Sequence, residues 1–221
     1  MGKASTSPKR KTPRRRRRKG GRRAFILAAV GAVSLALGAR ALLIQGYRVP
    51  SRSMEDSLLV GDLLLVDKLS YGLRIPFTNW RLPPLRDPSP GDVVAFEYPA
   101  DPTRILVKRC IAVAGQTIEV RNKVVYVDGE RLPDPPFSKY VDARILPGRD
   151  PRDNLSPRTI PAGSVFVMGD NRDNSRDSRH WGALSVDRLL GRGLLVYWSS
   201  EPDLGGESGR VRWSRLGYQV P

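Results

Sequence analysis

The order of apolar and polar residues divides the chain into two unlike parts. Residues 24–39 carry no charge, Arg40 interrupts the run, and ALLI continues it to residue 44. A helix needs about 20 predominantly apolar residues to cross a bilayer, so the pattern predicts a transmembrane helix over residues 24–45. Arg40 would then lie near one end of the span, where its long side chain reaches the headgroups.

Beyond residue 45 the pattern changes to short apolar runs that are separated by Gly, Pro and Asp. Such runs, bounded by turn residues, predict β-strands, and Asp128-Gly129 after VVYV indicates a hairpin turn. We expect a mainly β fold over residues 46–200, with one short helix over residues 183–190. The expected strands are residues 63–66, 93–96, 106–113, 117–120, 124–127 and 164–168.

Two segments fit this pattern poorly. Residues 131–160 are rich in Pro, Asp and Arg, a composition that favours an inserted loop or a small lobe. Residues 201–221 show no clear alternation, and we expect a C-terminal tail to which the sequence assigns no role. The expected organisation is therefore a basic tail, an apolar helix, a mainly β domain and a short C-terminal tail.

The net charge of +16 belongs mainly to one end of the chain. Residues 1–23 contain 12 Lys and Arg and no Asp or Glu, a composition that predicts a disordered tail. Basic segments beside a span stay in the cytoplasm, which predicts a single-pass protein of the cytoplasmic membrane with its N-terminus inside and its β domain outside. A basic tail is also typical of nucleic-acid binding. The adjoining span makes that interpretation the weaker one, and we expect no nucleic-acid partner.

A cleavable signal peptide is the alternative interpretation of the first 45 residues. Ala39-Arg40-Ala41 has the small-x-small form of a cleavage site. The apolar run continues beyond that site, however, and the basic segment before it is unusually long for a signal peptide. An uncleaved anchor therefore fits the sequence better.

Few catalytic groups are available. His180 is the one histidine and Cys110 the one cysteine, which excludes a multi-histidine or cysteine-based metal site. No phosphate-binding loop or dinucleotide fingerprint occurs, so we expect no metal and no cofactor. Cys110 lies in an apolar run and is expected to be buried. A Ser-His-Asp triad would need His180, which lies in a crowded charged segment, and we expect His180 and Trp181 to pack rather than to catalyse.

A serine activated by a lysine is the chemistry that is left. A lysine acts as a base only when burial lowers its pKa, because the free ammonium is protonated at neutral pH. Of the lysines after residue 45, Lys108 alone lies in an apolar run, ILVKRCIAVAG. On the residues alone, a surface lysine of an edge strand is the commoner alternative. The candidate serines, Ser51 and Ser53, flank Arg52 directly after the predicted span.

Four segments, in order, resemble the conserved boxes of the bacterial type I signal peptidases, also called leader peptidases. PSRSM (residues 50–54) resembles the P-S-x-S-M box, GDVVAFEYP (91–99) the Gly-Asp strand box and LVKRCIAVAG (106–115) the Lys-Arg box. MGDNRDNSRDSRHWG (168–182) resembles the G-D-N-x-x-x-S-x-D-S-R box. The resemblance implies a signal-peptidase-like β domain and a membrane-bound serine endopeptidase. Such an enzyme removes signal peptides from exported preproteins by Ser/Lys catalysis and cuts after small residues, in an Ala-x-Ala pattern.

The resemblance also implies which residues carry the reaction. Ser53 would be the nucleophile and Lys108 the general base. The Ser53 N–H and the Ser51 hydroxyl would form the oxyanion hole. Ser175 would hydrogen-bond to the Lys108 amine and orient it for proton transfer.

Further residues would support this pair or contact the substrate, by the same resemblance. The supporting groups would be two ion pairs and one turn, namely Asp177 with Arg179, Arg109 with Asp170, and Gly169 with Asn171. Two shallow pockets for small side chains would be lined by Val49, Met54, Leu58, Leu64, Leu106 and Val107.

The sequence departs from the family pattern at three positions. Asp56 and Ser57 stand where Pro and Thr are usual, and Gln116 stands where Asp is usual. The first two changes are expected to alter the local turn and to add negative charge near Ser53. All implied catalytic groups are nevertheless in place.

The implied partners are preproteins with signal peptides and the lipid bilayer, and we expect a monomer. Two other interpretations stay open. The Ser/Lys chemistry could serve one dedicated partner, or self-cleavage of the LexA type, although the span and the Lys-Arg box argue against self-cleavage. Alternatively, a non-enzymatic protein could bind nucleic acid or lipid through residues 3–23.

Overall fold

A computed structural model describes residues 21–75, 78, 80–148, 150–201 and 209–221. The chain forms two compact units, Met1–Arg40 and Ala41–Pro221. Most of the predicted basic tail lies outside the described residues.

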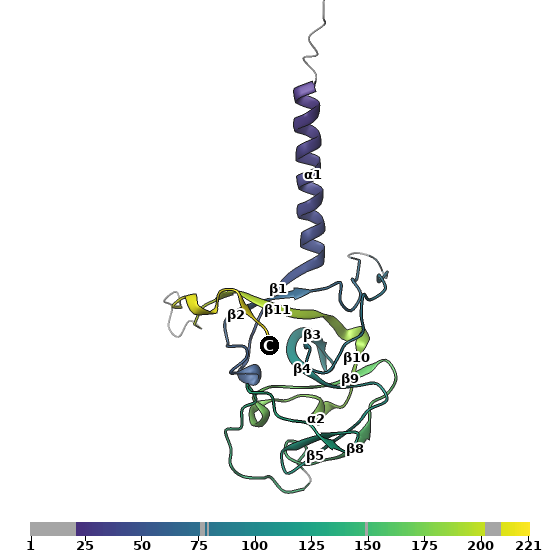
Figure 1. Cartoon of the computed structure of the whole chain (residues 1–221), viewed down its shortest axis with the longest axis vertical. Coiled ribbons are helices and arrows are strands. Elements are labelled where there is room, and N and C mark those ends of the chain that lie inside the picture. Colours follow the sequence, from purple (N-terminus) through teal and green to yellow (C-terminus); the bar gives the residue numbers. More distant parts are fainter. Residues whose placement is uncertain (1–20, 76–77, 79, 149, 202–208) are drawn as a thin grey trace, which may run out of the picture. The chain divides into compact units, whose positions relative to one another are not determined.

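Helix α1 (Gly21–Leu43) accounts for the described part of the first unit (Figure 1). The helix follows from the many Ala and Leu residues of this run, which are strong helix formers. Among the residues that the structure describes, no helix is long and apolar enough to cross a membrane. A helix is therefore present where we expected one, up to Leu43, and its transmembrane role stays a prediction.

The second unit is mainly β, as predicted, and its described strands form two sheets. The larger sheet has the strand order β1-β2-β11-β3-β4-β9-β10, with β12 beside β11, and the smaller sheet has the order β7-β6-β5-β8. Figure 1 shows β5 and β8 at the end of this unit opposite β1 and β11. The strands are β1 (Ile44–Arg48), β2 (Asp62–Asp67), β3 (Val93–Tyr98), β4 (Asp101–Val113), β5 (Thr117–Arg121), β6 (Val124–Val127), β7 (Glu130–Arg131), β8 (Leu155–Thr159), β9 (Ser164–Met168), β10 (Leu184–Ser185), β11 (Leu189–Ser199) and β12 (Tyr218–Gln219).

Short helical turns connect these strands. They are α2 (Ser178–Trp181) and the 3₁₀ turns η1 (Arg52–Met54), η2 (Arg172–Asn174), η3 (Val186–Arg188) and η4 (Trp213–Arg215). Turns η1 and η2 pack against each other, and η1 also packs against β4. The segments that contain the candidate serine and the candidate lysine are therefore neighbours in the fold.

All six predicted strands are present, and β6 and β9 have the predicted bounds. The predicted hairpin turn is confirmed, because Asp128 and Gly129 have φ values of 54° and 84°, the left-handed pair that a type I′ turn requires. Strand β4 begins five residues earlier than predicted, at Asp101.

The helix predicted over residues 183–190 is wrong. That segment contains β10, the single turn η3 and the start of β11, because β10 pairs with β9 and β11 pairs with both β2 and β3. Tertiary strand pairing overrides the local pattern here. Residues 131–160 contain β8, which pairs with β5 in the smaller sheet, and their description as an inserted loop or small lobe stays a prediction.

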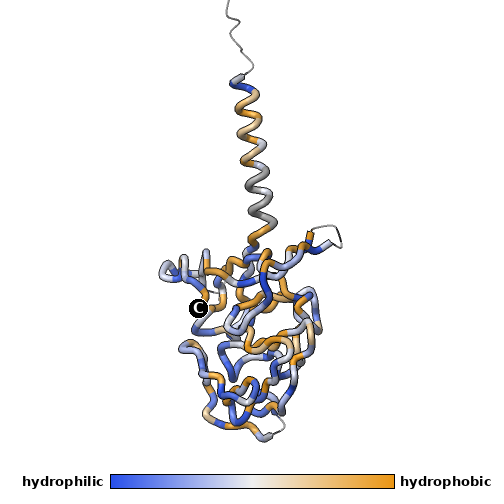
Figure 2. Tube along the Cα trace, turned by 45° about the vertical axis from the view of Figure 1, so that its right-hand side comes forward, coloured by the Kyte–Doolittle hydropathy of each residue, from blue (hydrophilic) through white to orange (hydrophobic). Residues whose placement is uncertain are grey.

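Strand β3 lies at the centre of the core. Val93 and Ala95 belong to one cluster of buried apolar side chains, and Val94 and Phe96 belong to another. Alternate residues of a strand point to opposite faces, so the large sheet is covered on both faces at β3. Figure 2 shows hydrophobic and hydrophilic stretches following one another along the chain of this unit. Strand β4 is the direct neighbour of β3, which places Lys108 in a region that excludes water.

The C-terminal segment is tied to the large sheet rather than being a free tail. Asp62, at the start of β2, is fully buried and accepts hydrogen bonds from Leu59 N at 2.8 Å and Ser199 Oγ at 2.6 Å. Arg215 Nη2 donates to the same carboxylate at 2.5 Å. A buried carboxylate needs such partners, because an unpaired one is strongly destabilising.

We predict that Arg215→Ala lowers the free energy of unfolding by roughly 2 kcal/mol, because it removes the nearer of the two cations of the buried Asp62 carboxylate and leaves Arg212 Nη1 at 3.9 Å. Chemical denaturation measures the change. The matched control is Asp187→Ala, which removes a carboxylate with 91% side-chain exposure from a pair with Arg81. The control should lower the free energy of unfolding by less than about 0.5 kcal/mol. Equal losses of unfolding free energy in the two variants would contradict the role of Arg215 as a partner of Asp62.

Candidate active site

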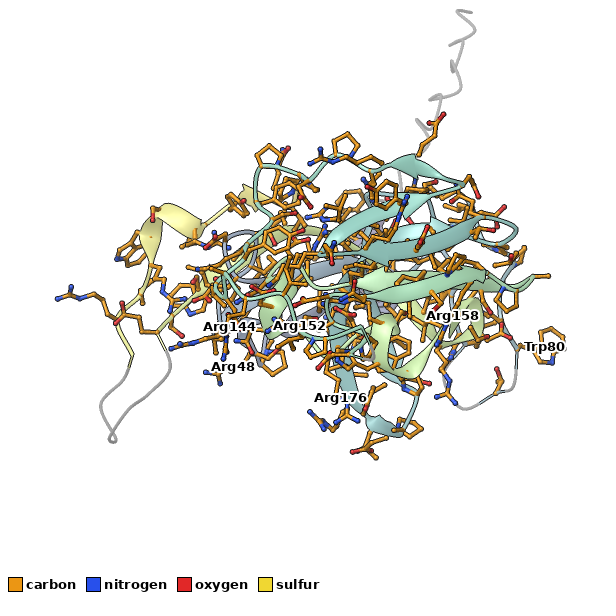
Figure 3. All side chains as sticks on the ribbon, turned by 90° about the horizontal axis from the view of Figure 1, so that it is seen from below. Arg48, Trp80, Arg144, Arg152, Arg158 and Arg176 are labelled. Carbon is orange, nitrogen blue, oxygen red and sulfur yellow. The ribbon has the colours of Figure 1, made fainter. Side chains whose placement is uncertain are left out.

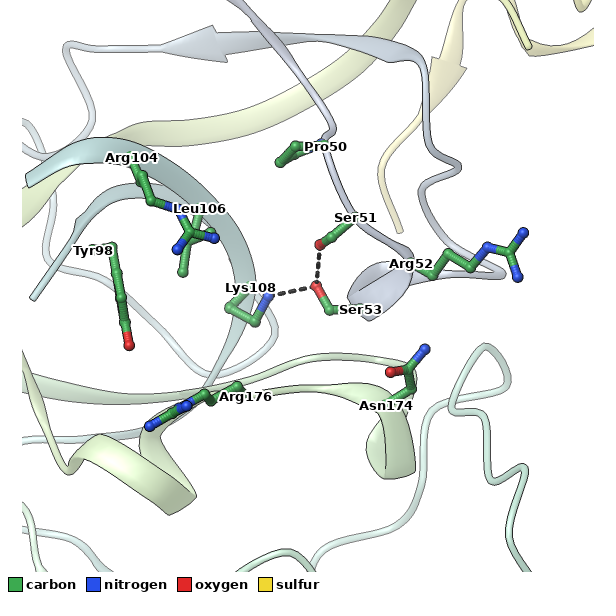
Figure 4. Close-up of a pocket in the computed structure, with 10 residues that line it drawn as sticks. All are labelled: Pro50, Ser51, Arg52, Ser53, Tyr98, Arg104, Leu106, Lys108, Asn174 and Arg176. Atoms are coloured by element: carbon green, nitrogen blue, oxygen red, sulfur yellow. Dashed lines mark hydrogen bonds between the residues drawn. The ribbon is translucent and has the colours of Figure 1, made fainter. Parts of the chain in front are cut away.

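Lys108 and Ser53 form a direct, buried contact. The Lys108 Nζ donates a hydrogen bond to Ser53 Oγ at 2.5 Å and a second to Val107 O at 3.1 Å. The exposed fraction is 2% for Lys108 and 8% for Ser53. In Figure 4 the amine and the hydroxyl point toward each other from β4 and η1, beside a cavity of about 330 Å³. The fold thus brings together two residues that are 55 positions apart.

The environment of Lys108 favours the neutral amine. Burial lowers the pKa of Lys108 from its ordinary value of 10.5 to about 8, against the opposing attraction of Asp177 and Asp170. Burial has this sign because it removes water from the charged form. A pKa near 8 leaves about a tenth of the amine neutral at pH 7, and half of it neutral one unit higher. Lys108 is therefore able to accept a proton at physiological pH.

Ser51 lies next to the serine–lysine pair. Its Oγ and the Oγ of Ser53 are 3.0 Å apart, within hydrogen-bonding distance. Ser51 is exposed and lines the cavity, whereas Ser53 belongs to the single turn η1. The first N–H groups of a helical turn have no partner inside that turn. The Ser53 N–H and the Ser51 hydroxyl are thus two donors on one side of the cavity.

The loop that follows β9 holds the backbone of Ser53. Asn171 N donates to Ser53 O at 3.1 Å, and Asn171 Nδ2 donates to Arg52 O at 3.2 Å. Gly169 lies so close that a Cβ atom there would be 2.4 Å from Ser53 O and 2.3 Å from Ser175 Oγ. Only glycine allows the two chain segments to approach this closely. The turn that Gly169 and Asn171 shape, as the resemblance predicts, therefore holds the backbone of Ser53 in place. We call this contact the clamp.

Both predicted ion pairs are present and buried. Arg109 Nε and Nη2 donate to the two oxygens of Asp170 at 2.9 Å each, the bidentate geometry that fixes direction as well as distance. Arg179 contacts Asp177 in the same way, at 2.9 Å and 2.9 Å. Asp177 also accepts from Gly169 N at 3.0 Å. The pairs therefore connect β4 and α2 to the loop that holds Ser53.

The predicted hydrogen bond between Ser175 and Lys108 is absent. Among the described residues, the buried Ser175 Oγ has no hydrogen-bond partner. The donors of Lys108 are directed to Ser53 Oγ and Val107 O instead, and Ser175 Oγ lies against Gly169. Val107 O thus takes the orienting position that we had expected Ser175 to occupy.

The predicted pocket residues divide into two groups. Leu106 lines the cavity. The other five are buried in one apolar cluster and do not line it, because strand pairing packs them against each other beneath the surface. They are Val49, Met54, Leu58, Leu64 and Val107. These five residues form a packed layer of the core, and the pockets for small side chains that the resemblance implies at these positions stay a prediction.

Three other expectations concern single residues. Cys110 is fully buried, as predicted, and burial raises the pKa of its thiol to about 12. Trp181 packs with Phe96 at a ring separation of 5.9 Å, as predicted. His180 is exposed, so the prediction that it packs is wrong. Among the described residues, no group of three or more His, Cys, Asp or Glu side chains is arranged to hold a metal ion.

The departures from the family pattern have structural roles. Ser57 is fully buried and donates to Asp170 Oδ2 at 2.5 Å. Asp56 has a φ of 82° and pairs with Lys139 at 3.1 Å, so its charge is partly neutralised. Gln116 accepts from Val113 N at 3.0 Å and closes a turn. Ser57 in particular adds a third donor to the carboxylate that Arg109 holds.

Besides Pro50 and Arg52, which adjoin the candidate serines, four residues that line the cavity were not predicted as site residues. Tyr98, Asn174 and Arg176 lie inside segments that resemble family boxes, and their positions there gave a signal that we did not use. Arg104 lies outside these segments and carries no such signal. All four are brought to the cavity by β3, β4 and the loop around η2. They are Tyr98, Arg104, Asn174 and Arg176.

This geometry defines the class of the protein as a mainly β hydrolase candidate in which a serine contacts a buried lysine of lowered pKa. Comparison with known proteins agrees. The model of the family described as "Signal peptidase, peptidase S26" matches residues 22–198. The chain belongs to this family, and its relatives place it among the bacterial type I signal peptidases. It is therefore a peptidase, which confirms the resemblance.

Individual relatives cover most of the chain. Signal peptidase I of Pseudomonas aeruginosa is 34% identical over 193 residues, covering 74% of this chain and 68% of that protein. Signal peptidase I of Bacillus caldolyticus is 32% identical over 172 residues, covering 76% of this chain and 86% of that protein. A solved structure of a signal peptidase I from Enterococcus faecalis V583 is 27% identical and covers 48% of this chain and 96% of that one, with a TM-score of 0.38.

We predict that Gly169→Ala abolishes most peptidase activity while leaving the protein folded. The added methyl group must displace the Ser53 carbonyl or Ser175, and a displacement of about 1 Å near the reacting atoms costs roughly a hundredfold in rate. Steady-state cleavage of a peptide, together with a thermal melt, measures both effects. The matched control is Gly163→Ala, where no atom lies within 4 Å of the added Cβ. Because Gly163 has a φ of 68°, the control should lose some stability but keep its rate. Full activity of Gly169→Ala would contradict the clamp.

Proposed function

We propose that this peptidase is a membrane-bound serine endopeptidase that removes signal peptides from exported preproteins, with Ser53 and Lys108 as its catalytic pair. The observation that carries the proposal is the 2.5 Å contact between the Lys108 amine and the Ser53 hydroxyl in a site that excludes water. A serine hydroxyl is a weak nucleophile until a base takes its proton. Among the described residues, Lys108 is the base in contact with it.

The reaction proceeds in two halves. The neutral Lys108 amine takes the Ser53 proton while Ser53 Oγ attacks the carbonyl of the residue before the cut. The resulting oxyanion accepts hydrogen bonds from the Ser53 N–H and from the Ser51 hydroxyl, which rotates away from Ser53 Oγ. The Lys108 ammonium then gives its proton to the leaving amine, and an acyl-enzyme forms. In the second half Lys108 activates a water molecule, which releases the signal peptide and restores Ser53.

The packed layer behind Ser53 favours small side chains next to the cut. Val49, Met54 and Leu58 have exposed fractions of 2% or less and belong to one packed cluster, and Met54 follows Ser53 directly in η1. A large side chain of the substrate would have to displace them, and overpacking a core is costly. This packing supports cleavage after small residues, in the Ala-x-Ala pattern that the resemblance implies. An extended substrate would lie along β4 and add backbone hydrogen bonds.

The segment before the domain supports a membrane anchor. The uncharged run from residue 24 follows 12 basic residues, so the N-terminus would stay in the cytoplasm and the domain would face the outer side. Anchoring places enzyme and signal peptide in one membrane, which raises their effective concentration. The proposed form is a single-pass monomer with preproteins and the bilayer as its partners.

Replacing either member of the pair should abolish cleavage. We expect Ser53→Ala and Lys108→Met each to lower kcat/KM for a preprotein by at least about a thousandfold. Lys108→Arg should fail as well, because a guanidinium does not lose its proton. The controls are Ser156→Ala and Lys68→Met, which change a serine and a lysine outside the cavity. Near-normal cleavage by Ser53→Ala would refute the proposed nucleophile.

The rate should depend on pH through the pKa of Lys108. Because the neutral amine is the base and its pKa lies at about 8, kcat/KM should rise about tenfold per unit below pH 8 and level off above it. The sign follows from the lowered pKa, since raising the pH converts ammonium to amine. Single-turnover cleavage between pH 6 and pH 10 tests this. A profile that is flat across that range, or that falls, would contradict a lysine base.

A further inference from the structure

Three arginines line the cavity beside the serine–lysine pair, and two of them, Arg104 and Arg176, lie far from Ser53 in sequence. Arg104 comes from β4 and Arg176 from the loop between η2 and α2, and both side chains are exposed. In Figure 4 they lie on the same side of Lys108 as Tyr98, whereas Arg52 points away from the pair on the other side. The mechanism proposed above uses neither Arg104 nor Arg176.

These arginines lack the partners that the buried arginines of this chain have. Arg109, Arg172 and Arg179 each pair with a carboxylate at 3.1 Å or less. Over the described part of the chain, Arg104 and Arg176 form no ion pair and no side-chain hydrogen bond, and no acidic residue lines the cavity. The acids that follow Ser53 along the chain, Glu55 and Asp56, face Lys139 instead. Asp101, near Arg104 in sequence, accepts hydrogen bonds from Thr103.

The position of Arg104 is set by the strand and by an aromatic ring. Arg104, Leu106 and Lys108 all line the cavity, as expected for alternate residues on one face of β4. Arg104 lies at the irregular start of β4, where the register with β3 shifts between Asp101 and Ile105. The Arg104 Cζ lies 5.6 Å from the centroid of the Tyr98 ring, a cation–π arrangement that restricts the guanidinium. A cation is thus held at the cavity that contains the reacting atoms.

We propose that Arg104 and Arg176 are specificity-determining residues that recognise an acidic side chain of the substrate within four residues of the scissile bond. The inference rests on the proposed function and extends it. An extended substrate beside β4 advances by about 3.3 Å per residue, so its side chains near the cut run along the strand toward Arg104. A guanidinium fork matches a carboxylate in two parallel hydrogen bonds. Arg176 adds a second positive charge from another segment.

Paired peptides test the preference. Each peptide carries one Ala-x-Ala cleavage site and a single Glu or Gln, placed in turn at each position from four residues before the cut to four after, the two Ala positions excepted. The full chain in neutral-detergent micelles should cleave the Glu peptide about fivefold more efficiently in kcat/KM at one or more positions, the size of effect that exposed ion pairs give. Salt should reduce this ratio. The ratio should fall to about one in the double variant Arg104→Gln/Arg176→Gln.

Arg158→Gln is the matched control. Arg158 is an exposed arginine of β8 that does not line the cavity, and Figure 3 shows it well away from Arg176. This variant should keep the ratio of the unaltered chain. A ratio near one at every position in the unaltered chain overturns the proposal. So does a ratio that survives in the double variant.

A binding experiment separates this proposal from the proposed function. If the Gln peptides are not cut, or are cut equally by Ser53→Ala, the assignment of the nucleophile fails. The acid preference is then read from the dissociation constants of the same Glu and Gln peptides on the Ser53→Ala chain, with the same expected ratio. A further outcome would overturn the proposal. If the unaltered chain shows no preference between the Glu and Gln peptides, and the double variant loses binding to phosphatidylglycerol-containing micelles, the two arginines bind lipid headgroups instead of substrate.

Discussion

The structure depends on burying one amine without a counter-ion beside a guanidinium that has one. Lys108 and Arg109 are consecutive residues of β4, and both are nearly fully buried. Arg109 makes a bidentate contact with the Asp170 carboxylate. Among the described residues Lys108 has no carboxylate in ion-pair contact, and its donors go to a hydroxyl and a carbonyl. The buried Arg109 therefore has a carboxylate partner and the buried Lys108 has none. For this reason burial lowers the pKa of Lys108.

The arrangement around Ser53 follows from this requirement. An amine on a long side chain acts as a base only where it is held against the group that it deprotonates. Strand β4 supplies the amine, η1 supplies the serine, and the loop after β9 holds η1 through Asn171 and the close approach of Gly169. Asp177, which pairs with Arg179, accepts a hydrogen bond from Gly169 N and so holds that loop in place. Three segments that are distant in sequence thus form one rigid site.

The sequence predicted those parts of the fold and site that depend on local pattern. The strands around Lys108 and the hairpin at Asp128-Gly129 could be found, because alternation and turn residues are local signals. Strands β8 and β11 could not, because their sequences are irregular and pairing with distant strands stabilises them. Ser175 was assigned to Lys108 by resemblance, whereas the structure directs the amine to Val107 O. The direction of one side-chain donor depends on packing that no sequence pattern records.

The charge of the cavity is a second property that only the fold reveals. Arg104 and Arg176 are 72 positions apart in the sequence, and each alone resembles an ordinary surface arginine. Their common cavity beside Ser53 gives them a shared role in substrate choice that is independent of the bond-breaking step. The site therefore combines a lysine of lowered pKa at its centre with positive charge at its border.

The most direct test of this account is the titration of Lys108 itself. The full chain with ¹³C-labelled lysine is followed by NMR from pH 6 to pH 12, and the Lys108 resonance is identified by its loss in Lys108→Met. The account predicts a midpoint at about 8 for this amine, well below the midpoints of the exposed lysines. A midpoint near the ordinary value of 10.5 would show that the amine stays charged, and it would contradict the catalytic role proposed for Lys108.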